Sequence, residues 1–558
     1  MNAVETADVD QRIDTAPPSR SLARDSRTMA IGTAASRVTG LLRTLVFAAV
    51  LGVEGVRQGF DVANTLPNSL YELLLGGVLT STLVPLLVRA RAGDDHEAYT
   101  QRLLTLIPLA LTVLTGLAML GAAPLVRLYS TSTDAGQIEL SVAWARFFLP
   151  QILFYGMSAT IGAVLNTRDR FAAPVWAPVL NNLVVIMTLA AFILIPGPSR
   201  LTSLTITGAQ LVVLGIGTTL GVVVMTVALL PSLHASGFRW RLRWDFRGMG
   251  LAAVGRMAAW TVVLVVALQV SFLVLTRLAT NVGQLPQYVN AFTIWQLPYA
   301  VVGVSVITAL LPRMSRHAVD GRPDLLRQDL ERGQRIAALV LVPASLAFIV
   351  LGRHIAVTLF AHRATTYSQA EQIGVVLGIL AIGLLPFSIY QLQSRAFYAM
   401  SDTRTPALVQ VLVSTSMVVV DVSASALLPD GSRVYGLAAG LVVANCVGAG
   451  VATVLVRRRL GSADRRPADG PGSRPSQARA LWRMLAAGVA GAVAAGAVAM
   501  ALTPNVPRDW TGSALVLTLA CLADLVIYAG ALVLLKVDEA RSALATLTHR
   551  RMSDRDVT

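Results

Sequence analysis

Two arginines inside an otherwise apolar stretch are the residues best suited to chemistry. Arg37 and Arg43 stand six positions apart within residues 29–52, a stretch long enough to cross a bilayer as a helix. An arginine at the centre of such a span costs about 2.5–3.5 kcal/mol on insertion scales. A planar guanidinium can hold two phosphate oxygens at once, so we predict that the pair binds an anionic headgroup. The alternative is a buried ion pair with Asp61 or Glu72.

A second polar pattern follows in the next apolar stretch. Asp61, Asn64, Asn68 and Glu72 stand at positions i, i+3, i+7 and i+11, which places them on one stripe of a helix, with Pro67 in its middle. We predict that this stripe lines the same cavity as the two arginines and contacts the headgroup. The alternative is that these side chains serve as polar links between neighbouring helices.

Further polar residues in apolar stretches are weaker candidates for the cavity. Arg277 stands 234 residues after Arg43, which makes it a candidate counterpart of that arginine in an internal repeat. Asp421 and Asp524 stand alone, and ordinary hydrogen bonds between helices explain them. The possible cavity residues are Ser36, Arg277, Asn290, Thr293 and Gln296.

The elements that must position these residues are membrane-spanning helices. The chain has 558 residues, of which 54% are hydrophobic and 14% charged, with a mean hydropathy of +0.63; soluble chains carry about 25% charged residues. We therefore predict an all-α integral membrane fold of about fourteen transmembrane helices. The expected spans are 29–52, 61–89, 103–128, 141–165, 173–195, 206–231, 252–280, 286–312, 336–360, 371–399, 405–428, 434–456, 480–503 and 512–536.

The positive charges predict the orientation of these spans. Arginines concentrate in every second loop, which the positive-inside rule assigns to the cytoplasm, and both termini fall on that side. The opposite loops hold few, among them Arg57. A net charge of +15 spread between apolar stretches lacks the single basic face of a nucleic-acid binder, so no nucleic acid is expected. The expected location is the cytoplasmic membrane.

An internal repeat is visible in the Leu-Pro pairs. Those at 66–67 and 149–150 recur at 297–298 and 385–386, at offsets of 231 and 236 residues. Six helices per unit predict a parallel repeat with a substrate site between the halves. The predicted parts are a disordered cytoplasmic tail (1–28), an N-terminal six-helix lobe (29–235), a C-terminal six-helix lobe (250–457), a cytoplasmic linker (458–479), two additional helices (480–536) and a cytoplasmic tail (537–558).

No motif of an enzyme is found. The sequence has no GxxxxGK[ST] phosphate loop, and the predicted outer loops have no carboxylate pair or histidine cluster. Cys446 and Cys521 lie singly in apolar stretches without a CxxC motif. We therefore expect a transporter rather than an enzyme, with no metal site and no cofactor.

Several motifs together resemble the MurJ/MviN family of lipid II flippases. They span both six-helix units in order, and the segment 153–156 (Leu-Phe-Tyr-Gly) resembles the actinobacterial branch in particular. The resemblance implies the multidrug/oligosaccharidyl-lipid/polysaccharide exporter fold and the movement of lipid-linked peptidoglycan precursor from the inner to the outer leaflet for cell-wall synthesis. It also maps two of the family's cavity arginines onto Arg37 and Arg43. The matching segments are 36–43, 62–68, 165–171 with Pro174 and Pro178, and 397–406.

The sequence departs from the family in its cavity charges. Many members carry an acid at Gln58, arginines at Tyr71 and Glu72, a glutamate at Gly76 and an arginine near Thr293. Expected partners are the lipid-linked precursor, membrane lipids and cell-wall synthesis proteins. The alternatives are an exporter of another polyprenyl-diphosphate oligosaccharide or of a small molecule, and a cell-wall scaffold that transports nothing.

Overall fold

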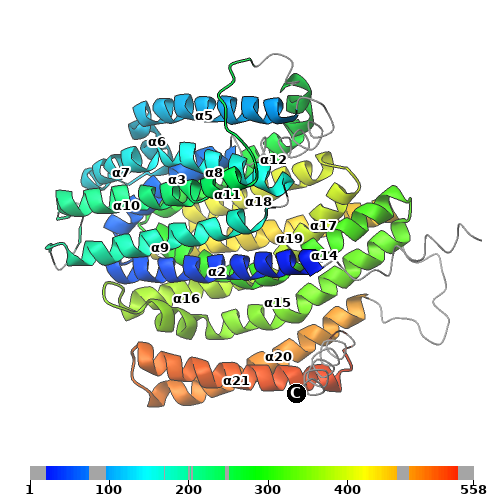
Figure 1. The fold of residues 1–558 in the computed structure, drawn as a ribbon. Coiled ribbons are helices and arrows are strands. Elements are labelled where there is room, and N and C mark those ends of the chain that lie inside the picture. Colours follow the sequence, from blue (N-terminus) through cyan, green and yellow to red (C-terminus); the bar gives the residue numbers. More distant parts are fainter. Residues whose placement is uncertain are drawn as a thin grey trace, which may run out of the picture.

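The computed structural model describes most of the chain, and the described part is helical. It covers residues 20–73, 96–132, 134–168, 170–198, 201–202, 205–245, 251–461, 477–537 and 539. No strand occurs within these residues. The long helices run roughly side by side, as the predicted membrane fold requires (Figure 1).

The N-terminal lobe begins with a helix longer than expected. Helix α2 is described from Arg20, within the predicted tail 1–28, and residues 1–19 lie outside the described residues, so the boundary of the tail stays a prediction. The lobe consists of α2 (Arg20–Leu51), α3 (Val56–Tyr71), α5 (His96–Leu120), α6 (Ala122–Tyr129), α7 (Ala135–Phe148), α8 (Gln151–Thr167), α9 (Ala172–Leu194), α10 (Gly208–Val227) and α11 (Leu230–Ala235).

The C-terminal lobe and a terminal helix pair follow. Helix α19 extends to Leu460 and α20 begins at Gln477, so both helices enter the predicted linker, of which residues 462–476 lie outside the described part. The lobe consists of α12 (Leu251–Asn281), α13 (Leu285–Trp295), α14 (Leu297–Val319), α15 (Pro323–Phe360), α16 (Tyr367–Ile382), α17 (Leu384–Ala399), α18 (Arg404–Leu427), η2 (Asp430–Ser432) and α19 (Arg433–Leu460). The terminal pair is α20 (Gln477–Leu502) and α21 (Trp510–Leu534), with η4 (Thr503–Asn505) between them.

The number of spans agrees with a multi-pass membrane protein. Eleven described helices are long and apolar enough to cross a membrane, and twelve if α16 and α17 form one bent span. Two of the fourteen predicted spans are not among them. Residues 74–95 of the span 61–89 lie outside the described residues, and the span 286–312 is divided between α13 and α14. The count of fourteen therefore stays a prediction.

Three of the four repeated prolines lie at or near interruptions of helices, whereas Pro67 lies inside α3. Helix α7 gives way to α8 at Leu149 and Pro150, and α16 gives way to α17 at Gly383, with a bend of 46°. Pro298 lies in the first turn of α14. A proline cannot donate a backbone hydrogen bond, so a helix tends to bend or restart there. The Leu-Pro pairs at 149–150 and 385–386 thus both lie at breaks between helices, whereas those at 66–67 and 297–298 differ.

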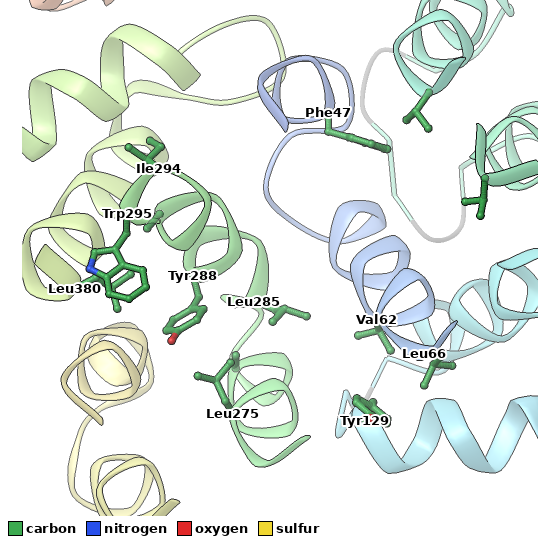
Figure 2. Close-up of a cluster of buried hydrophobic side chains, with 14 of the residues drawn as sticks. Phe47, Val62, Leu66, Tyr129, Leu275, Leu285, Tyr288, Ile294, Trp295 and Leu380 are labelled. Atoms are coloured by element: carbon green, nitrogen blue, oxygen red, sulfur yellow. The ribbon is translucent and has the colours of Figure 1, made fainter. Parts of the chain in front are cut away.

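Aromatic contacts hold the core of each lobe. In the N-terminal lobe the ring of Phe60 meets those of Trp144 and Phe148 edge-on, with centroids 5.5 and 5.1 Å apart. In the C-terminal lobe Trp295 contacts Phe387 at 5.1 Å. Figure 2 shows the apolar side chains of α3 on one side and those of α12 and α13 on the other. One continuous apolar core therefore joins the two lobes.

The terminal pair packs against α15 at the edge of the molecule (Figure 1). The hydroxyl of Tyr528 donates a hydrogen bond to the carbonyl of Leu339, at 2.7 Å. Gly488 allows a close approach, because a Cβ atom there would lie 2.8 Å from Cγ1 of Val342. The pair is therefore attached to one helix of the C-terminal lobe through its own small apolar cluster.

Candidate functional site

Helix α9 fixes the rotation of α2, and with it the direction of the two predicted arginines. The amide of Asn182 donates to the carbonyl of Ser36 at 3.2 Å and to the hydroxyl of Thr39 at 3.0 Å. Gly32 lets the helices approach, since a Cβ atom there would lie 2.7 Å from Cγ1 of Val175. The small and polar residues of α2 thus face α9.

The two arginines have different environments. Arg37 is exposed, whereas Arg43 is half-buried. Arg43 is close enough to Tyr155, Arg57 and Asp61 to interact with each electrostatically. Within the described residues, however, the guanidinium of Arg43 has neither a hydrogen bond nor an ion pair. A half-buried cation without a counter-ion is suited to bind an anion that arrives from outside the protein.

Asp61 is already paired, but with Arg57. Nε of Arg57 lies 2.8 Å from Oδ1 of Asp61, one helical turn along α3. Arg57 is only 4% exposed and its guanidinium lies 5.0 Å from the ring centroid of Phe47. The interpretation of Arg57 as a loop residue is wrong, because α3 already begins at Val56. The carboxylate of Asp61 is therefore held in a buried ion pair, and the pairing of Arg43 with Asp61 is not observed.

The other members of the stripe are less buried. Asn64 is half-buried and Asn68 is exposed; the amide of Asn68 donates to the carbonyl of Asn64 at 3.1 Å. Oε2 of Glu72 accepts from Nε2 of Gln269 on α12, at 3.2 Å. Glu72 therefore links the two lobes, which favours the interpretation of a polar link at this position.

Two tyrosines lie near Arg43, and one of them, Tyr71, is a position at which the resemblance implies an arginine. The rings of Tyr71 and Tyr155 lie 5.7 Å apart between α3 and α8. Phenol hydroxyls can donate hydrogen bonds to phosphate or sugar oxygens without adding charge. Gly76, where the resemblance implies a glutamate, lies outside the described residues.

Hydrogen bonds join the lobes at the end where α2 finishes, here called the Leu51 end. The guanidinium of Arg277 donates to the carbonyls of Arg127 and Leu128, at 3.1 and 2.9 Å. Beside it, Nε2 of Gln58 donates to the carbonyl of Thr280 at 3.0 Å. Arg277 therefore binds the last turn of α6 across the lobe boundary.

A second set of bonds joins the lobes at the same end. The hydroxyl of Thr365 donates to the carbonyl of Ala48 at 2.8 Å, and the backbone N–H of Ala364 donates to Ala49 at 3.3 Å. The segment between α15 and α16 thus contacts the last turn of α2. Two separate sets of hydrogen bonds therefore join the lobes at the Leu51 end.

The candidates in α13 differ in their hydrogen bonding. Asn290 is 0% exposed, and neither polar atom of its amide has a partner among the described residues. The hydroxyl of Thr293 donates within its own helix, to Val289, at 2.8 Å. Gln296 is half-buried at the junction of α13 and α14. Of the three, Asn290 has the greatest unused capacity for hydrogen bonds.

Asp421 is a candidate that the sequence analysis set aside. It is 0% exposed in α18, and neither carboxylate oxygen has a hydrogen-bond partner within the described residues. Gly440 of α19 packs directly against it, because a Cβ atom there would lie 1.9 Å from Oδ1. Ordinary bonding between helices does not explain this residue. An ionisable side chain within a span is itself a signal of function.

The described residues contain no group of three or more His, Cys, Asp or Glu side chains that could hold a metal ion. Asp421 stands apart from other carboxylates, and both cysteines are free and exposed. The candidate site is therefore built from a cation, tyrosines and amides.

Comparison with known proteins identifies the family. The family model described as "Lipid II flippase MurJ" matches residues 47–520, which is most of the chain. The chain belongs to the MurJ family of lipid II flippases. A probable lipid II flippase MurJ of Vibrio cholerae is 26% identical over 401 residues, covering 69% of this chain and 74% of the relative. The lipid II flippase MurJ of Burkholderia cenocepacia is 27% identical over 389 residues, covering 67% and 73%.

Solved structures show the same fold. A structure described as lipid II flippase MurJ in an inward closed conformation superposes with a TM-score of 0.73 at 18% identity, covering 92% of this chain and 99% of the other. An inward-facing multidrug resistance MATE family transporter of the MOP superfamily gives 0.61 at 15% identity, covering 79% and 100%. The MurJ family thus shares its fold with exporters, and the resemblance to its actinobacterial branch stays a prediction.

Proposed function

We propose that this protein moves lipid II, the lipid-linked peptidoglycan precursor, from the inner to the outer leaflet of the cytoplasmic membrane by alternating access. Membership of the MurJ family supports the substrate. The observation that carries the mechanism is Arg43, a half-buried cation without an ion pair in the described structure. The nearby Arg57–Asp61 pair leaves the charge of Arg43 available.

The physical task explains why such a cation is needed. A diphosphate with its sugar and peptide cannot enter the hydrocarbon core unaided, whereas the apolar polyprenyl tail is soluble there. Arg43 supplies a fixed charge for the diphosphate, and Tyr71 and Tyr155 add hydroxyl groups beside it. Arg37 is exposed and would meet the headgroup on its way in. With the headgroup between the lobes, the tail can remain in the lipid.

We further propose that the Leu51 end faces outward and that both termini are cytoplasmic. The arginine-rich loops lie at the opposite end, as the positive-inside rule requires. In this orientation the hydrogen bonds at Arg277 and Thr365 close the outer side. The conformation described here would then be one that takes up substrate from the cytoplasmic leaflet.

The test is the substitution Arg43→Ala, measured by the accessibility of lipid II at the outer surface of cells that depend on this chain. We expect at least a tenfold loss of flipping with normal membrane insertion, and partial recovery in Arg43→Lys, which restores charge but not the bidentate fork. Arg508→Ala, at an exposed arginine before α21, is the matched control.

The same variant separates the alternatives. A scaffold without transport activity would support cell-wall synthesis equally well with alanine at residue 43, and that result would refute the proposal. An exporter of another lipid-linked sugar would lose activity too. Native mass spectrometry with lipid II and with other polyprenyl-diphosphate lipids distinguishes this case, because we expect preferential retention of lipid II.

A further inference from the structure

A short segment between the lobes lies along α5 and is fastened to it. We call residues 236–245 the strap; it follows α11 and crosses α5 in Figure 1. Nε2 of Gln101 donates to the carbonyl of Arg239 at 3.0 Å, and the backbone N–H of Arg243 donates to the hydroxyl of Thr105 at 3.1 Å. The strap is therefore an ordered part of the fold.

Both ends of the strap are also anchored. Arg168 donates to the carbonyl of Ser236 at 2.9 Å and stacks on the buried ring of Phe238, 5.1 Å from its centroid. At the other end Arg102 forms an ion pair with Asp245, at 3.1 Å. These anchors come from the loop after α8 and from α5, so the N-terminal lobe fixes the strap at both ends.

The side chains of the strap alternate between two faces. Arg239, Arg241 and Arg243 line a hollow of about 310 Å³ together with Glu97, Ala98 and Gln101 of α5. The residues that alternate with them are apolar and face outward: Trp240, Leu242 and Trp244 are 36%, 67% and 65% exposed. Such alternation is typical of an extended chain, whose successive side chains point in opposite directions.

The hollow favours an anion. Among the described residues, three arginines line it against one carboxylate, that of Glu97. Nε of Arg243 donates to Gln101 at 3.0 Å, whereas the guanidinium groups of Arg239 and Arg241 have no partner among the described residues.

We propose that the strap binds the headgroup of an anionic phospholipid of the membrane. The phosphodiester would lie between Arg239 and Arg241, and Trp240, Leu242 and Trp244 would enter the interface beside the acyl chains. Tryptophan concentrates at this depth of a bilayer, and basic pockets at the membrane surface attract anionic lipid headgroups. A soluble acidic partner would not require three exposed apolar side chains between the arginines. This site is separate from Arg43 and does not depend on the transported substrate.

The test is the double variant R239Q/R241Q of the full chain, purified in detergent and titrated with phosphatidylglycerol or phosphatidylcholine in native mass spectrometry. The matched control is R316Q/R508Q, at two exposed arginines outside the strap. We expect the control and the unmodified chain to retain phosphatidylglycerol over phosphatidylcholine, and the strap variant to bind phosphatidylglycerol at least fivefold more weakly. Equal binding by both double variants would overturn the proposal.

Two further measurements sharpen the result. Glycerol 3-phosphate at millimolar concentration should not displace phosphatidylglycerol; full displacement would mean that the hollow takes free phosphate esters rather than lipid. In vesicles, brominated phosphatidylglycerol should quench tryptophan fluorescence less in W240F/W244F than in the unmodified chain. Unchanged quenching would place the strap away from the lipid and contradict the proposal.

Discussion

The two lobes bury charges of opposite sign, although the repeated Leu-Pro pairs predict that they share one arrangement of helices. The N-terminal lobe buries Arg57 with Asp61 and half-buries the unpaired Arg43. The C-terminal lobe buries Asp421, whose carboxylate has no partner in the described structure. A shared fold therefore does not give the lobes a shared chemistry. One lobe is suited to an anionic headgroup, and the other holds an acid that a proton or a cation must neutralise.

The two arginines that the predicted sequence repeat would relate, Arg43 and Arg277, also differ in their contacts. Arg277 stands 234 residues after Arg43, but it donates to carbonyls of the other lobe. Arg43 has no such bond. The prediction that Arg277 is a cavity counterpart of Arg43 is therefore not what the described hydrogen bonds favour. Arg277 therefore contacts the other lobe, whereas the charge of Arg43 has no partner in the described structure.

The largest expected effect comes from breaking the charge pair of the N-terminal lobe. Asp61→Asn leaves Arg57 buried without a counter-ion, which costs about 3–5 kcal/mol. We expect a large drop in the thermal unfolding midpoint of the detergent-purified chain. The double variant Arg57→Met/Asp61→Leu removes both charges and should reverse much of this drop in the unfolding midpoint. A midpoint unchanged by Asp61→Asn would show that the pair contributes no stability.

The same substitution in the C-terminal lobe should act in the opposite direction. Asp421→Asn keeps the volume and removes an acid without a partner, so we expect a gain of about 1–3 kcal/mol in unfolding free energy. Lipid II flipping in cells should fall at least tenfold if this acid binds a proton or cation during transport. Destabilisation by Asp421→Asn would instead indicate a structural partner and remove the contrast between the lobes.

The smallest effect is expected at Asp402, between α17 and α18. Burial raises the pKa of its carboxyl, but hydrogen bonds from the N–H and hydroxyl of Thr405, at 3.0 and 2.7 Å, outweigh it and leave the pKa below its usual range. A lowered folded-state pKa contributes stability above the unfolded-state pKa, and this stability is lost as the pH falls through the folded-state value.

Asp402→Asn should therefore cost about 1 kcal/mol or less near neutral pH, as for the loss of a helix cap. Thermal midpoints of the variant and the unmodified chain, measured across acidic to neutral pH, should converge as the pH falls. A difference that grows toward acid would reverse the assigned sign.

Sequence patterns predicted the helices well because each span must carry about 20 apolar residues whatever its neighbours are. They also singled out Arg43, since a deep cation is costly. They did not predict the Arg57–Asp61 pair. Its i, i+4 spacing is visible in the sequence, but the expected helix began at residue 61 and left Arg57 outside. The isolation of Asp421 depends on the packing of Gly440, which no local pattern reveals.

An arginine of each lobe stacks on an aromatic ring near one end of the chain that connects the lobes. Arg168 of the N-terminal lobe stacks on Phe238, and Arg404 of the C-terminal lobe stacks on Trp260 at 5.4 Å. The N-terminal lobe therefore holds the connecting chain as far as Asp245, and the C-terminal lobe holds it at Trp260. Inserting residues between Asp245 and Leu251 would lengthen this connection without changing any residue proposed to contact the substrate, and we expect it to alter how far the lobes move relative to each other.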